Sequence, residues 1–156
     1  MSKWSDPGEW RRLYEGERYP VCRSIEMEGR CLGTIVELDT GYLTTHRDQP
    51  VRGYCCLVLK RHAVESHDLQ EDKAAGFMRD MRHVSRALKS VTGAVKMNLE
   101  IHGNTIPHLH VHFFPRYVGD RFEDGPIDLH EPWLSELSSE EPEAFADGMR
   151  AALTEG

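Results

Sequence analysis

Apolar residues recur along this chain with two different periods, and the change between them lies near residue 93. Before that point they are spaced by three and four positions: Phe77, Met81, Val84, Leu88 and Val91. This spacing places them on one face of an α-helix, which we expect to pack against a core. Asp68 with Glu71 is expected to cap the start of this helix, and Thr92-Gly93 to end it.

Beyond residue 93 apolar and polar residues alternate, which is the pattern of a β-strand with one buried face. Residues 95–101 form one such strand, and residues 108–114 form a second after a short turn at 103–105. We therefore expect an antiparallel hairpin. With this loop, Asn98 pairs directly with His110 and shares its face of the sheet.

Shorter segments complete the expected fold. Gly53 to Leu59 is almost entirely apolar, as in a central strand that is buried on both faces. Further extended segments are expected at 22–27, 31–38 and 41–45, and helices at 7–15, capped by Ser5 or Asp6, and at 141–153.

Length, charge and cysteine content narrow the class of protein. The 156 residues suffice for one domain with a real core. A formal net charge of -7 argues against a general nucleic-acid binder, which needs a basic surface. The adjacent Cys55-Cys56 are expected to be small core residues. No apolar stretch could span a bilayer and the N-terminus lacks the apolar core of a signal peptide, so we expect no membrane partner and a cytoplasmic location.

The most informative residues are three histidines at alternate positions of the second strand, His108, His110 and His112. Alternate side chains of a strand share one face, so the three imidazoles should form a row, with the apolar residues between them pointing into a core. Imidazole has an unperturbed pKa of about 6.5, which leaves it nucleophilic and still protonatable near neutral pH. The row therefore indicates chemistry on phosphate, a metal or a proton.

One interpretation of the row is a metal site. Neighbouring histidines on a strand can supply two ligands, with a third from elsewhere. The outer two histidines lie about 13 Å apart at ~3.3 Å per residue, too far for all three to bind one ion. A cupin-like site would also have a glutamate soon after the histidines, where this chain has Phe113-Phe114-Pro115. A metal-dependent hydrolase stays an alternative.

The other interpretation is phosphate chemistry through a covalent intermediate. The middle imidazole, His110, would attack phosphorus through one ring nitrogen while the other donates to a nearby carbonyl and so fixes the tautomer. The outer histidines would bind phosphate oxygens or protonate the leaving group. Asn98, Asn104 and Thr105 would add neutral donors around the transferred group. An uncharged donor set suits an intermediate that has to be released.

These residues resemble the histidine triad (HIT) family, whose motif is His-φ-His-φ-His-φ-φ with φ apolar. His108 to Phe114 match the motif completely, and residues 103–107, 115–117 and the upstream Lys60-Arg61-His62 are similar to those of bacterial members. The resemblance covers roughly residues 33–118. It implies an α+β fold: an antiparallel sheet of about five strands with one long helix and flanking shorter helices, usually assembled as a homodimer. We expect a single domain over residues 1–156, with a core at about 20–118 and a C-terminal extension at 119–156 that ends in a helix.

The resemblance also implies an activity, that of a nucleotide hydrolase that passes through a nucleotidyl-histidine intermediate and needs neither a metal nor a cofactor. The site residues that it implies are the nucleophile His110, the α-phosphate contacts His112 and Asn98, Asn104 and Thr105 near the phosphate or leaving group, and the supporting His108. The uridylyltransferase branch of the family usually has glutamine at the position of His112, so a histidine there favours hydrolysis over nucleotidyl transfer.

Two positions depart from the family pattern. Many members have a histidine directly after the glycine of the central strand, where it supports the triad, and this chain has Tyr54. A phenol can donate one hydrogen bond but, with a pKa of about 10, does not share a proton near pH 7. Eight residues earlier the family often has an acidic or amide group that binds the ribose. Here His46 takes that place, with Asp48 close by.

We therefore predict a hydrolase that acts on adenosine or other purine nucleotides with a phosphoramidate, acyl-phosphate or polyphosphate leaving group and releases the nucleoside monophosphate. His46, Asp48 and Tyr54 join the candidate substrate-binding residues. The expected partners are the nucleotide and a second copy of the chain. Two alternatives stay open: a metal-dependent hydrolase with strand histidines as ligands, and a non-catalytic nucleotide-binding protein.

Overall fold

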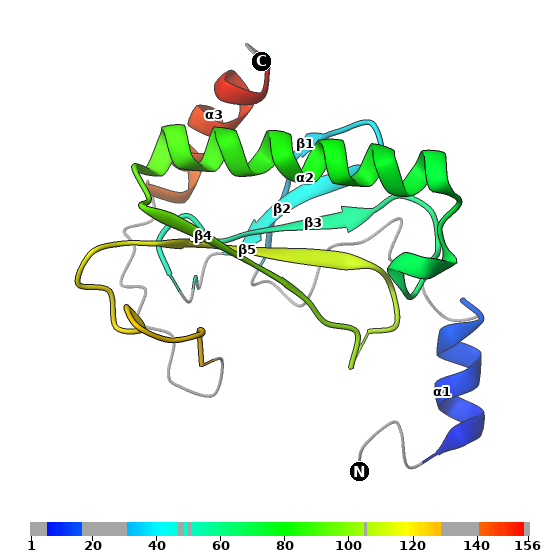
Figure 1. Ribbon diagram of the computed structural model, residues 1–156. Helices are drawn as coiled ribbons and strands as arrows, with labels where there is room; N and C mark the ends of the chain where they lie inside the picture. Colours follow the sequence, from blue (N-terminus) through cyan, green and yellow to red (C-terminus); the bar gives the residue numbers. More distant parts are fainter. Residues whose placement is uncertain are drawn as a thin grey trace.

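Five antiparallel strands form one sheet in the order β1-β2-β3-β5-β4 (Figure 1). The computed structural model describes residues 6–16, 31–46, 49, 51–104, 106–128 and 141–154. The strands are β1 (Cys31–Glu37), β2 (Gly41–His46), β3 (Cys55–Leu59), β4 (Lys96–Ile101) and β5 (His110–Arg116). The helices are α1 (Pro7–Tyr14), the short 3-10 helix η2 (Ser66–Asp68), α2 (Glu71–Thr92) and α3 (Glu141–Thr154). The predicted α+β fold is confirmed, while the strand expected at 22–27 lies outside the described residues.

The central strand is β3, as its apolar sequence predicts, and all five of its residues are buried. Helices α2 and α3 lie over one face of the sheet (Figure 1). The core on that face joins Leu43, Leu57, Val111 and Phe113 of the sheet to Phe77, Val84 and Leu88 of α2 and to Met149 and Leu153 of α3. The segment that was expected to be a C-terminal extension thus contributes a helix to the main core. A smaller cluster covers part of the other face and consists of Tyr54, Cys56, Val58, Phe114 and Ile127.

The long helix α2 ends as predicted but begins differently. Gly93 closes it in the left-handed conformation, with φ of 71°, which a glycine adopts without strain. At its start, Gln70 makes no side-chain cap. The predicted cap by Asp68 is wrong, because its carboxylate turns back to the preceding turn and accepts the backbone N–H of Glu65 at 2.9 Å.

The hairpin of β4 and β5 forms with a register that differs from the prediction. Asn98 lies opposite Phe114 instead of His110, a shift of four residues, and Glu100 lies opposite His112. Because the shift is even, Asn98 keeps the same face of the sheet as both histidines. The predicted pairing is wrong, but the predicted face is right.

The register differs because residues just before β5 have other partners. The N–H of Leu109 donates to the carbonyl of Ala63 at 2.7 Å, and the carbonyl of Leu109 accepts the N–H of Leu59 at 3.1 Å. These bonds tie Leu109 to Leu59 of β3 and to Ala63 after it. The connection between β4 and β5 therefore spans residues 102–109 instead of the expected 103–105.

The N-terminal helix α1 lies apart from α2 and α3, beyond the end of the sheet (Figure 1). Asp6 caps it by accepting the N–H groups of Gly8 and Glu9 at 3.0 and 3.1 Å. Within the described part of the chain, none of the helices combines the length and apolar character that crossing a membrane requires.

Candidate active site

Two of the three predicted histidines lie in β5, and the third lies just before it. His110 and His112 are alternate residues of the strand, and their rings meet edge to face with centroids 4.8 Å apart. His108 precedes the strand and is almost completely buried. Its Nε2 donates to the carbonyl of Leu59 on β3 at 2.7 Å. The row is therefore held from two strands, and its first member is oriented by the neighbouring strand.

The backbone fixes which nitrogen of His110 can react. Its Nδ1 lies 2.6 Å from the carbonyl oxygen of His108. A carbonyl can only accept, so Nδ1 carries the hydrogen, and Nε2 of the neutral ring keeps its lone pair. This is the arrangement that the covalent phosphate mechanism requires of its nucleophile.

Burial keeps the three rings neutral. It is the largest cause that lowers the pKa of His108 and His110, and the hydrogen bonds to backbone carbonyls oppose it more weakly. For His112, burial and the neighbouring imidazoles lower the pKa to about 3. At neutral pH the row is thus a set of uncharged imidazoles, which suits nucleophilic attack and neutral hydrogen bonding.

Tyr54 holds the ring of His112. The phenolic oxygen lies 2.6 Å from Nδ1 of His112, and the two rings stack with centroids 5.9 Å apart. Because the phenol carries a hydrogen, it can donate to Nδ1, and the neutral ring then has its own hydrogen on Nε2. Tyr54 is itself buried, with 3% of its surface exposed. Tyr54, which the sequence analysis predicted to bind substrate, therefore holds the ring of His112 in place.

The strand β4 borders the row on its other side. Asn98 shares the face of the histidines but lies opposite Phe114, and Asn104 is exposed in the connection that follows. Between them are two residues that the sequence reasoning did not select. Glu100 lies opposite His112, and its Oε2 is 2.9 Å from Nε2 of His102. Both could have been found in the sequence, because they continue the polar positions of the alternating segment that contains Asn98.

On the β2 side, the structure brings one predicted ribose-binding candidate near the row. The ring of His46 lies 5.7 Å from that of Tyr54. Asp48 and Thr105 lie outside the described residues. The neighbouring Gln49 is buried and bonds within the protein, because its Oε1 accepts the N–H of Gly53 at 2.7 Å and its Nε2 donates to Thr45 at 2.9 Å. Gln49 thus anchors the segment that leads into β3.

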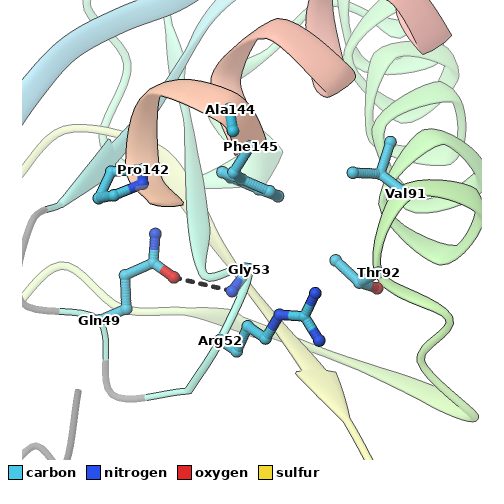
Figure 2. A pocket seen from close by; sticks show the side chains of 8 residues that line it. All are labelled: Gln49, Arg52, Gly53, Val91, Thr92, Pro142, Ala144 and Phe145. Carbon is cyan, nitrogen blue, oxygen red and sulfur yellow. Dashed lines mark hydrogen bonds between the residues drawn. The ribbon is translucent and has the colours of Figure 1, made fainter. Parts of the chain in front are cut away.

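A separate pocket of about 250 Å³ opens beside Gly53 (Figure 2). Its walls come from the end of α2, the start of α3 and the residues before β3, with the Arg52 side chain at one side and Phe145 at another (Figure 2). None of the predicted site residues that the structure describes lines it. We therefore assign the candidate active site to the histidine row.

The far end of β5 holds a second buried polar group. The guanidinium of Arg116 donates to both carboxylate oxygens of Asp120, at 2.9 and 2.8 Å, and to the carbonyls of Phe122 and Gly125. The hydrogen bond with Arg116 is the main cause that lowers the pKa of Asp120 to about 2. This ion pair organises the loop after β5, next to the histidines but without contact to them in the hydrogen bonds described.

A metal site was the other interpretation of the histidine row. Across the described ranges, no three histidine, cysteine, aspartate or glutamate side chains are grouped so that they could hold an ion. Cys55 and Cys56 are buried free thiols in the central strand, as expected for small core residues.

The comparisons with known proteins agree with this geometry. The family model of the HIT domain matches residues 33–119. A histidine triad protein from Bradyrhizobium japonicum is 28% identical, with a TM-score of 0.71 over 83% of this chain and 96% of that one. A histidine triad (HIT) protein from Sinorhizobium meliloti is 27% identical, with a TM-score of 0.69 over 76% of this chain and 87% of that one. A histidine triad protein from Marinobacter aquaeolei is 21% identical, with a TM-score of 0.69 over 78% of this chain and 88% of that one, which shows the fold alone. No curated protein matches significantly.

Proposed function

We propose, from the premise that the chain belongs to the HIT domain family, that it hydrolyses purine nucleotides through a nucleotide bound covalently to His110. Family membership supports a nucleotide-binding or hydrolase function in general. The observation that carries the more specific proposal is the 2.6 Å bond from Nδ1 of His110 to the carbonyl of His108, which leaves Nε2 free to attack. The proposed substrates are adenosine nucleotides with a phosphoramidate, acyl-phosphate or polyphosphate leaving group.

The reaction has two displacements at phosphorus. In the first, Nε2 of His110 forms a bond to the α-phosphorus, and the leaving group departs with the electron pair of the broken bond and takes up a proton. In the second, water attacks the same phosphorus, the P–N bond returns its electron pair to His110, and the water loses a proton. The products are the nucleoside monophosphate and the free enzyme.

Neutral donors would hold the phosphoryl group through both steps. We assign Nε2–H of His112 and the amide of Asn98 to the α-phosphate oxygens, with Asn104 and Thr105 near the phosphate or the leaving group. Donors of this kind stabilise the charge that develops in the transition state. They attract the product less strongly than cations would, which favours its release.

The test of the proposal is to trap the intermediate. Rapid quench in alkali, where the P–N bond is stable, with a radiolabelled adenosine phosphoramidate should leave one equivalent of AMP on the protein, attached to His110 and located by peptide mapping. Turnover without any labelled His110 would contradict the covalent mechanism. AMP binding without turnover across phosphoramidates, aminoacyl-adenylates and dinucleoside polyphosphates would favour a non-catalytic binder. Loss of activity with a chelator would favour the metal-dependent alternative.

The proposal includes a homodimer that forms through β4. This strand is one edge of the described sheet, and Leu99 and Ile101 in it, with Val95 just before it, are exposed although they are apolar. Pairing with β4 of a second copy would cover them and satisfy the open edge. Light scattering should give twice the chain mass for the wild type and a single chain mass for Leu99→Glu. A wild-type monomer would contradict the dimer, and the cytoplasmic location expected from the sequence stays a prediction.

A further inference from the structure

Resting on the function proposed above, we propose that His102, paired with Glu100, is a further catalytic residue that gives its proton to the leaving group. The proposal starts from a chemical need. An alkylamine cannot leave phosphorus as an anion, so the departing nitrogen has to receive a proton as the P–N bond breaks. A donor must therefore stand next to the histidine row.

The row itself is poorly suited to supply this proton. Burial lowers the pKa of all three histidines, and that of His112 to about 3. Nε2 of His108 is committed to the carbonyl of Leu59, and Nδ1 of His110 to that of His108. The row therefore provides the nucleophile and neutral hydrogen bonds, and the acid has to come from another group.

His102 has the position and the partner that such an acid needs. Its ring lies 5.5 Å from that of His112, and its Nε2 is 2.9 Å from the carboxylate of Glu100. The carboxylate can accept the hydrogen on Nε2 and so fixes the orientation of the ring. Because Glu100 occupies Nε2, the nitrogen left for the substrate is Nδ1. The side chain of His102 is 40% exposed, so it can exchange protons with water between turnovers.

The strand order places His102 on the side where the leaving group is expected. His46 lies at the end of β2, and β3 separates that strand from β5. If the nucleoside lies toward His46, the group opposite the nucleophile extends over β4, where Glu100 and His102 lie. Asn98, Glu100 and His102 are alternate residues, so this side of the site is built from one strand and its first following residues.

The proton balance is complete without another reactant. The imidazolium of His102 gives the Nδ1 proton to the departing atom while Nε2 of His110 forms its bond to phosphorus. The leaving group departs as a neutral amine, and His102 becomes a neutral imidazole that is still bonded to Glu100. It recovers a proton from the water that attacks in the second displacement.

The test compares two substrates whose leaving groups differ in their need for a proton. One is AMP joined to an alkylamine through a P–N bond, and the other is the p-nitrophenyl ester of AMP, whose leaving group departs as an anion. Formation of the His110 adduct is followed by rapid quench in a single turnover. For His102→Asn we expect a loss of about 10²-fold with the phosphoramidate and less than about threefold with the ester.

Two further variants separate catalysis from structure. Glu100→Gln keeps the shape but removes the charge, and it should reduce the phosphoramidate rate in the same selective way by about tenfold. His67→Asn is the matched control, because His67 is an exposed histidine that, like His102, lies near a carboxylate, with its Nε2 3.8 Å from Asp68 in η2. It should leave both rates unchanged.

The possible failures are distinguishable. Equal losses with both substrates, or no loss with either, for His102→Asn would overturn the role of His102 while adduct formation by the wild type upholds the proposed function. If the wild type forms no adduct with either substrate, the proposed function fails and the role of His102 fails with it.

Discussion

The two ends of β5 hold polar groups that differ in charge: those at its start are neutral, and those at its end are ionised. At the start of the strand, His110 and His112 bond to a backbone carbonyl and a phenol, and burial lowers the pKa of both, so they stay neutral. At its end, Arg116 and Asp120 bond to each other, and the pairing keeps both ionised. The difference shows that burial alone does not decide the charge of a group, because the partner it meets decides whether ionisation is favoured.

The same comparison separates residues suited to catalysis from residues that hold the fold together. A neutral imidazole with a free lone pair can attack, whereas the guanidinium of Arg116 uses four of its five N–H groups to hold Asp120, Phe122 and Gly125. We therefore expect changes at the histidine end to alter the rate, and changes at the arginine end to alter the stability.

The largest expected effect is on the rate, from His110→Ala. Removing the nucleophile should lower kcat/KM for an adenosine phosphoramidate on the order of 10³-fold or more. The ring of His110 contributes little to the main core, so the melting temperature should change by only a few degrees, as on the order of 1 kcal/mol implies. Steady-state kinetics and calorimetry on the same preparation check both parts. Retention of full activity would rule out His110 as the nucleophile.

The largest expected effect on stability comes from Arg116→Met. The substitution leaves the Asp120 carboxylate, whose side chain is only 11% exposed, without its cation and should lower the free energy of unfolding by about 3 kcal/mol. Urea denaturation measures the change, and the fraction that stays folded should keep its kcat within about threefold. Arg11→Met is the control, because Arg11 forms an exposed pair with Glu15 within α1. It should leave the free energy of unfolding nearly unchanged. Equal losses for both variants would contradict the comparison.

The two ends should also lose stability in different pH ranges. His112 has a folded pKa of about 3, well below the ordinary value of 6.5, so the unfolded state binds more protons between these values. Stability is therefore lost as the pH falls below 6.5, by about 2 kcal/mol between pH 7 and 5. Asp120 has a folded pKa of about 2 against an ordinary 3.8, so its contribution is present above pH 4 and lost below it. That loss is about 1 kcal/mol between pH 5 and 3.

Variants assign each range to its residue. His112→Asn should reduce the slope of the free energy of unfolding between pH 7 and 5, where His108 and His110, whose pKa values are also lowered, supply the rest. Asp120→Asn should reduce the slope only below pH 5. Urea titrations at four pH values provide the measurement. A wild-type slope that persists between pH 7 and 5 in His112→Asn would place the proton uptake elsewhere.

How far the sequence predicts this molecule depends on the range of the interactions. The helix α2 and the strand β3 could be predicted from local patterns. The apolar stripe that includes Val84 and Leu88 can be buried only as a helix, and the short apolar run that ends at Leu59 is typical of a buried strand. The connection between β4 and β5 includes Leu109, which bonds to residues about fifty positions away. Alternation sets the face of Asn98 but leaves the register open, since an even shift preserves every face.

The candidate site shows the same division. The row of three histidines and the need for a carbonyl at His110 follow from spacing and chemistry. The pair of Glu100 and His102 does not, because two residues of an alternating strand gain a role only when the register sets them beside His112. Tyr54 was visible as a departure from the family pattern, but its partner required the packing of β3 against β5.

The smallest expected effect, and the finest test of the comparison, is the loss of one hydroxyl. Tyr54→Phe keeps the ring that packs on Phe114 but removes the bond to Nδ1 of His112, so the neutral imidazole no longer has a preferred tautomer. We expect kcat/KM to fall by about fivefold, as a lost bond of about 1 kcal/mol implies. Tyr54→His should recover part of it, because an imidazole can also donate to Nδ1. Tyr117→Phe makes the same change at the other end of β5, where the hydroxyl donates to the carbonyl of Arg52 at 2.9 Å. It should leave the rate unchanged, and an equal loss in both variants would mean that the hydroxyl of Tyr54 acts through stability and not through His112.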